Sequence, residues 1–90
     1  MFTKVEAARS LSRRVAIHNG TQMPRVEYSI ASKTFCTQVA FEVTSDAVQI
    51  FGGNGLTRDY PVEKLMRDAR ASLIEDGCND VLAMEGAFKL

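Results

Sequence analysis

The chain has 90 residues, 46% hydrophobic and 24% charged, a size and composition that suit one small globular domain and argue against disorder. Its 11 basic residues balance its 11 acidic ones, so it lacks the positive field that binds nucleic acid. No segment approaches the ~18 uninterrupted apolar residues that span a bilayer, and no apolar signal-peptide core begins the chain. We therefore expect a cytoplasmic protein that binds neither nucleic acid nor membrane.

The first segment carries apolar residues every three or four positions from Phe2 to Val15, with charged residues mostly between them. This spacing predicts an amphipathic helix. Asn19-Gly20 is typical of a left-handed stop, so we expect the helix to end near residue 19. Pro24 suits the first turn of the next element.

The second segment runs from Arg25 to Phe51 without glycine or proline and predicts one long helix. At 1.5 Å per residue it would be ~40 Å long, more than one small bundle covers, so part of it should pack on another domain or subunit. Its apolar residues recur at spacings of four and three: Ala31, Phe35, Val39, Val43, Ala47 and Ile50.

Gly52-Gly53 should end that helix, and residues 54–60 read as a polar loop. Pro61 predicts the start of a third helix that extends to about Ile74, with an ion pair between Glu63 and Arg67. Its inward face would comprise Val62, Leu65, Met66 and Ala69.

Gly77 should end the next connection, with Cys78 or Asn79 capping a last helix whose apolar face comprises Val81, Met84 and Phe88. Residues 1–90 thus predict an all-α helical bundle. Cys36 and Cys78 lie far apart, and His18 is the single histidine. We therefore expect two free thiols and no metal site.

Two short runs could carry chemistry. The glycines of residues 52–55 either cap a helix or let backbone amides approach a cofactor phosphate or ribose. Neither Walker spacing nor a preceding strand supports a classical nucleotide-binding loop. Glu75-Asp76, before Gly77, is either a solvated pair or includes a base that burial beside a ligand would activate.

The string AVQIFGGNG, followed by YPVEKLMRDAR and I-x-x-G over residues 47–77, resembles the C-terminal signature of the acyl-CoA dehydrogenase family. The EAAR of residues 6–9 and the second helix fit the preceding helices of that family. The resemblance implies that residues 1–90 are part of a C-terminal four-helix domain. The family also has an N-terminal helical domain and a middle β-domain, so the chain is expected to be a fragment completed by self-association.

The resemblance implies α,β-dehydrogenation of an acyl-CoA thioester with FAD, in a dimer or tetramer. Asp76 aligns with the catalytic glutamate that takes the α-proton, and Gly77 with a residue beside the thioester. Flavin contacts are implied at two places. A strip toward the FAD of a neighbouring subunit comprises Gln49, Ile50, Phe51, Gly52 and Gly53, and a flavin-contacting turn comprises Cys78, Asn79 and Asp80.

The match departs from the family at the turn, where the usual string is Tyr-Glu-Gly-Thr. Asp76 is one methylene shorter than glutamate, Glu75 replaces the tyrosine, and Cys78 replaces the threonine. Some family members place the base on an earlier helix, so that alternative stays open. A second hypothesis is a non-catalytic helical module that self-associates through exposed apolar faces.

Overall fold

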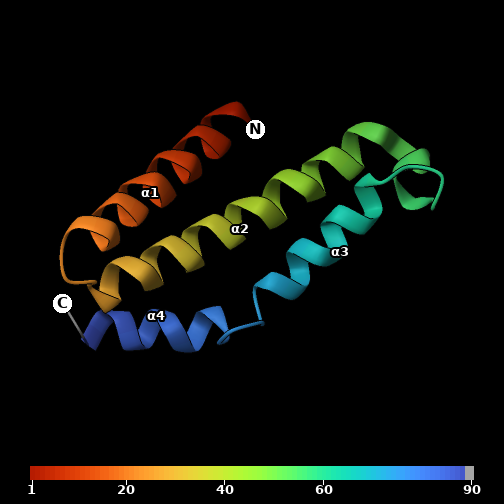
Figure 1. The fold of residues 1–90 in the computed structure, drawn as a ribbon. Helices are drawn as coiled ribbons and strands as arrows, with labels where there is room; N and C mark the ends of the chain where they lie inside the picture. Colours follow the sequence, from red (N-terminus) through yellow and green to blue (C-terminus); the bar gives the residue numbers. More distant parts are fainter. Residues whose placement is uncertain (89–90) are drawn as a thin grey trace.

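The computed structural model describes residues 1–88 and the side chains of residues 1–86. Over that range the chain is all-helical, as the sequence predicts (Figure 1). The elements are α1 (Phe2–Thr21), α2 (Val26–Phe51), a 3-10 helix η1 (Gly52–Leu56), α3 (Val62–Ser72) and α4 (Asn79–Phe88). No helix in residues 1–88 has both the length and the apolar character needed to cross a membrane.

Helix α2 is the axis of the molecule, and α1, α3 and α4 each pack against it (Figure 1). Helices α1 and α3 run antiparallel to α2, and α4 returns beneath its N-terminal half. The result is elongated, with extents of 46 × 24 × 17 Å. Each of the other three α-helices therefore depends on α2 for packing.

The core is thin. Its buried apolar residues are Val15, Val39, Val62, Ala69 and Leu73, and none of the described side chains is fully buried. Two large residues of the apolar repeat on α2 are exposed, Phe35 by 42% and Ile50 by 73%. Leu65 of α3 is exposed by 53%, which contradicts its predicted inward orientation, because α3 has only α2 and η1 to pack against.

Helix α1 ends two residues later than predicted, and Gly20 is helical rather than left-handed. The stop comes at Gln22, whose backbone is extended and whose N–H donates to the carbonyl of His18 at 2.9 Å. Pro24 disfavours helical backbone at the residue before it, which explains why the chain stays extended here. Pro24 itself lies outside α2, which begins at Val26.

The predicted bounds of α2 agree with the structure at both ends. Three threonines within it donate a side-chain hydrogen bond to the backbone carbonyl four residues earlier, at 2.6–2.9 Å. These bonds join Thr34 to Ile30, Thr37 to Lys33 and Thr44 to Ala40. The helix stops at Gly52, where φ is +64°. Part of the predicted loop 54–60 belongs to η1.

Helix α3 shows the predicted ion pair, with 2.6 Å between Arg67 Nε and Glu63 Oε1. It ends at Ser72, earlier than the predicted Ile74, and continues as turns through residue 76. Helix α4 begins at Asn79, after Cys78, whose carbonyl accepts the N–H of Leu82 at 3.0 Å.

Two of the three apolar residues predicted for one face of α4 are exposed on this chain. Val81 and Met84 are exposed by 62% and 64%, and the side chain of Phe88 lies outside the described residues. Helix α4 instead meets α2 through Gly86, because a Cβ added there would approach Ile30 to 3.2 Å. The two cysteines are free thiols, as expected.

Candidate functional site

The strip from Gln49 to Gly53 lies at the C-terminal end of α2 and is exposed throughout. Three of its five residues line a surface cavity of about 320 Å³. The lining comprises Val48, Gln49, Gly52, Gly53 and Leu56. The ring of Phe51 instead packs edge-on against Tyr60, with 5.6 Å between ring centroids. This end of α2 therefore offers backbone and a glutamine amide to a ligand or partner.

The glycines in this region serve different purposes. Gly52 has a φ of +64°, which favours glycine and ends α2. Gly55 is buried, and a Cβ there would lie 2.6 Å from the carbonyl oxygen of Val48. Gly53 has neither constraint, since its φ is not positive and a Cβ would meet nothing within 4 Å. The fold of the chain therefore does not explain why residue 53 is glycine.

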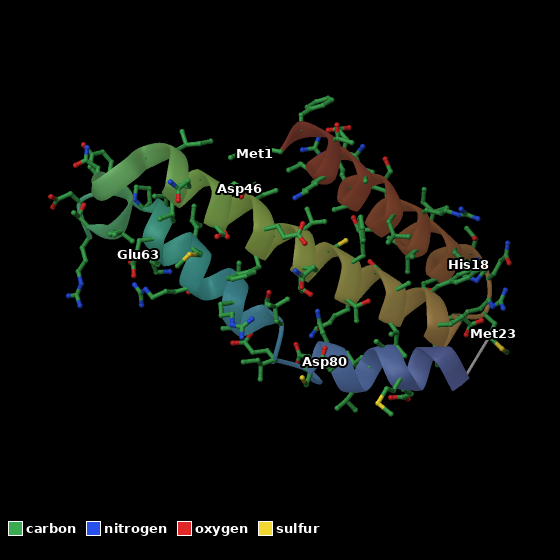
Figure 2. The ribbon with its side chains drawn as sticks, turned by 180° about the vertical axis from the view of Figure 1, so that it is seen from behind. Met1, His18, Met23, Asp46, Glu63 and Asp80 are labelled. Atoms are coloured by element: carbon green, nitrogen blue, oxygen red, sulfur yellow. The ribbon has the colours of Figure 1, made fainter. Side chains whose placement is uncertain are left out.

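The second candidate region is the turn of residues 75–78 between α3 and α4, all of which are exposed. Asp76 has a φ of +55° and Gly77 a φ of +102°, so two consecutive residues are left-handed. Asp76 is the one described residue other than glycine with positive φ. Asp80 lies at the start of α4, just beyond this turn (Figure 2).

Asn79 joins the turn to α2 through its side chain. Its Nδ2 donates to the hydroxyl of Thr37 at 2.9 Å and to the carbonyl of Thr34 at 3.4 Å, and its Oδ1 accepts from the ammonium of Lys33. Of the three residues predicted for the flavin-contacting turn, Asn79 is thus half-buried and bonded within the chain, whereas Cys78 and Asp80 are exposed.

A cavity of about 170 Å³ lies beside the turn, between α2, α3 and the start of α4. All three residues of the predicted flavin-contacting turn line it, and Arg70 contributes a cation. The guanidinium of Arg70 also lies over the ring of Phe41, 5.4 Å from its centroid. The lining comprises Gln38, Arg70, Leu73, Ile74, Cys78, Asn79 and Asp80.

The two candidate regions are far apart in one chain. Asn79 bonds to Thr37, and Gln49 is twelve residues further along the same helix, a rise of ~18 Å. A single copy therefore does not join the strip and the turn into one pocket. That separation is compatible with the expectation that the strip serves a cofactor of a neighbouring subunit.

Lys33, Gln38 and Arg70 lie at the turn region but were not among the residues that the sequence pattern predicts. A signal for Lys33 was available, because it is the only charged residue between Glu27 and Glu42. A lone cation in a neutral stretch of helix has no partner within its own helix, so it is a candidate for a contact with another element. Nothing in the spacing of Gln38 or Arg70 distinguishes them from ordinary helix surface residues.

The geometry defines an all-helical domain with two candidate ligand surfaces. Comparison with known proteins then identifies its family, since residues 1–88 match the model described as "Acyl-CoA dehydrogenase, C-terminal domain". The chain belongs to the acyl-CoA dehydrogenase family, and corresponds to that C-terminal domain.

Two relatives illustrate the similarity. The chain is 48% identical over 82 residues to a probable acyl-CoA dehydrogenase of Mycobacterium tuberculosis, covering 90% of this chain and 21% of that protein. It is 39% identical over 79 residues to the cyclohexane-1-carbonyl-CoA dehydrogenase of Geobacter metallireducens, covering 88% of this chain and 21% of that protein. The chain thus spans about a fifth of the length of these relatives.

Two solved structures share the fold closely. A chain of the structure titled for the electron transferring flavoprotein of Acidaminococcus fermentans superimposes with a TM-score of 0.91 at 45% identity, over 97% of this chain and 23% of that one. The butyryl-CoA dehydrogenase of Megasphaera elsdenii gives a TM-score of 0.90 at 39% identity, over 98% of this chain and 24% of that one.

Proposed function

We propose that this chain is the C-terminal helical part of a FAD-dependent acyl-CoA dehydrogenase that introduces an α,β double bond into an acyl-CoA thioester. Family membership and the names of the relatives support the reaction class. In this proposal the chain acts with the other domains of such an enzyme, in the cytoplasm and as a homo-oligomer. The chain alone is not expected to turn over substrate.

Gly53 carries the cofactor part of the proposal. It lines a cavity, its backbone conformation suits any residue, and the space where a Cβ would stand is open. A glycine in such a position costs backbone entropy and returns nothing to the fold. Close approach of a ligand would give it a purpose, and open space beside its backbone leaves room for a cofactor such as FAD. Gln49, Ile50, Phe51, Gly52 and Gly53 would hold the FAD of a neighbouring subunit, and Cys78, Asn79 and Asp80 would form a flavin-contacting turn.

Asp76 is the proposed base. Its side chain forms no hydrogen bond or ion pair with the described residues, so both carboxylate oxygens are free to face a substrate. Once substrate covers the turn, the carboxylate accepts the proton from the α-carbon of the thioester, while Gly77 lies beside the thioester group. FAD, when bound, supplies the acceptor for the hydride of the β-carbon. The positive φ of Asp76 re-aims its short side chain, as strained residues at functional sites often do.

Asp76→Asn tests this assignment in the flavin-loaded enzyme that contains the chain. Asparagine tolerates positive φ, so the turn should persist. Loss of a general base should slow acyl-CoA-dependent bleaching of the flavin by about 10²–10⁴-fold. Glu75→Gln is the matched control, because it removes the neighbouring exposed carboxylate and should leave the bleaching rate near the wild-type value. Wild-type bleaching in Asp76→Asn would show that the base lies elsewhere.

A non-catalytic, self-associating helical module is the second candidate function. The observation that favours it is the amount of exposed apolar side chain, including Phe2 at 78%, Ile17 at 67% and Leu56 at 71%. Apolar surface of this extent usually marks an interface. This alternative would be favoured if the full-length protein that contains the chain binds no FAD and therefore shows no flavin bleaching with acyl-CoA.

A further inference from the structure

The turn that carries Asp76 needs support from outside itself. Asp76 and Gly77 are both left-handed, and this conformation is unfavourable for a residue with a Cβ, such as Asp76. Within the turn, the N–H of Glu75 bonds back to Ala71 at 3.0 Å and that of Asn79 to Leu73 at 2.9 Å. The carbonyl of Gly77, at the centre of the turn, is left for a partner from elsewhere.

Lys33 of α2 supplies that partner. Its ammonium donates to the carbonyl oxygen of Gly77 at 2.8 Å and also to Oδ1 of Asn79. Asn79 in turn donates to the hydroxyl of Thr37, one helical turn beyond Lys33. Hydrogen bonds from an ionised donor are about twice as strong as neutral ones, so Lys33 forms a charge-assisted link between this turn and α2.

Packing beneath the turn restrains it from the other side. A Cβ at Gly77 would lie 3.1 Å from Cδ2 of Leu82, so α4 packs closely against the turn, and a side chain at this point would require Leu82 to shift. Lys33 has its nearest described partners in Gly77 and Asn79, and no ion pair with Asp76 is formed. The ammonium therefore acts on the backbone beside the carboxylate and leaves the carboxylate itself unpaired.

We infer that Lys33 is a positioning residue: through the Gly77 carbonyl and Asn79 it sets the place of Asp76 relative to α2, and so to the substrate. This inference rests on the proposed function for its catalytic consequence. Its structural part, that Lys33 orders residues 73–82, does not depend on that function. A misplacement of about 1 Å can cost ~10²-fold in rate, so losing one tie at this turn has a measurable effect.

Two measurements on the flavin-loaded enzyme that contains the chain test the inference. Lys33→Met removes the ammonium but keeps an unbranched side chain that reaches to the position of Cε. We expect amide hydrogen exchange over residues 73–82 to accelerate about tenfold, in proportion to the weakened local structure. We expect the rate constant of flavin bleaching per bound flavin to fall by ~10–10²-fold, with substrate affinity nearly unchanged.

Two further variants sharpen the result. Lys64→Met is the matched control, because Lys64 forms only an exposed ion pair with Asp68 within α3. It should change neither measurement. Lys33→Arg keeps a cationic donor and should restore part of the lost rate, which also separates the missing charge from misfolding.

The outcomes are distinct. Wild-type exchange over residues 73–82 in Lys33→Met overturns the inference, whatever the enzyme does. A lower flavin content with an unchanged rate per bound flavin also overturns it, because that result describes a merely structural lysine. If acyl-CoA does not bleach the flavin of the wild-type enzyme, the result contradicts the proposed function instead. Amide hydrogen exchange then still decides whether Lys33 orders the turn.

Discussion

Gly53 and Gly55 are two residues apart, yet the structure requires only one of them to be glycine. Gly55 is wedged against the backbone of Val48 and the Cβ of Phe51, whereas Gly53 faces open space. Asp76 gives the opposite case, a residue with a Cβ in a conformation that favours glycine. At both sites the residue type departs from what local folding prefers, which is the pattern expected where a ligand rather than the fold selects the residue.

The two glycines predict opposite responses to alanine. Gly53→Ala should leave the free energy of unfolding unchanged or raise it by up to about 1 kcal/mol, because it reduces the freedom of the unfolded chain. Gly55→Ala should lower it by about 1–3 kcal/mol, since the backbone of α2 must move away. Urea unfolding of both variants beside the wild type measures this difference.

The functional counterpart is FAD affinity. Gly53→Ala should weaken FAD binding to the apoenzyme that contains the chain, while the same variant stays folded. A titration that gives wild-type affinity would mean that Gly53 does not approach the cofactor.

An ion pair links helix α1 to helix α2. Lys4 Nζ lies 3.0 Å from Glu42 Oε2, and both side chains are partly exposed. The hydrogen bond from Lys4, followed by one from Gln38, lowers the pKa of Glu42 below its ordinary value of 4.5. The hydrogen bond to Glu42 and the attraction of its charge raise the pKa of Lys4 above 10.5.

These shifts predict how the docking of α1 depends on pH. The lowered pKa of Glu42 contributes stability above 4.5 that is lost as the pH falls through its folded value. The raised pKa of Lys4 contributes stability below 10.5 that is lost as the pH rises through its folded value. Lys4→Met should therefore lower Tm slightly at neutral pH. The difference in Tm between variant and wild type should vanish at both pH extremes and at high salt.

Thermal unfolding monitored by circular dichroism across this pH range checks the prediction. Arg13→Met is the control, since Arg13 is an exposed cation on the same helix that forms no ion pair with the described residues. A Lys4→Met gap that stays constant at all pH values would show that the ion pair does not stabilise the docking.

The whole molecule is more extended than a self-sufficient domain of its length. Its radius of gyration is 15.0 Å, whereas a compact domain of this size has about 12 Å. Three helices share one partner, α2, and the core comprises five buried apolar residues. Many large apolar side chains consequently face solvent, among them Ile50, Leu65, Ile74 and Met84.

The isolated chain should therefore self-associate. Burial of exposed apolar area contributes about 25 cal/mol per Å², which favours a second copy or another domain over solvent at these faces. Sedimentation velocity over a range of concentrations should show a weight-average mass that rises above the 9.9 kDa monomer. A folded monomer at every concentration would contradict this expectation.

The sequence by itself determined the elements and the family. The spacing of apolar residues, together with glycine and proline at helix ends, located the four helices. The string from Ala47 to Gly77 identified the acyl-CoA dehydrogenase family. These signals are local, so they survive without knowledge of packing. The prediction that α1 ends at Asn19-Gly20 was wrong, because the helix continues to Thr21 and the extended backbone before Pro24 ends it.

The tertiary structure alone decided how the candidate site is arranged. It set Lys33 against Gly77 across 44 residues of sequence, gave Asp76 its positive φ and separated the strip from the turn along α2. It also distinguished Gly53 from its neighbours and left Leu65 exposed. Each of these depends on what lies opposite a residue in space, because hydrogen bonds and burial across elements leave no periodic mark in the sequence.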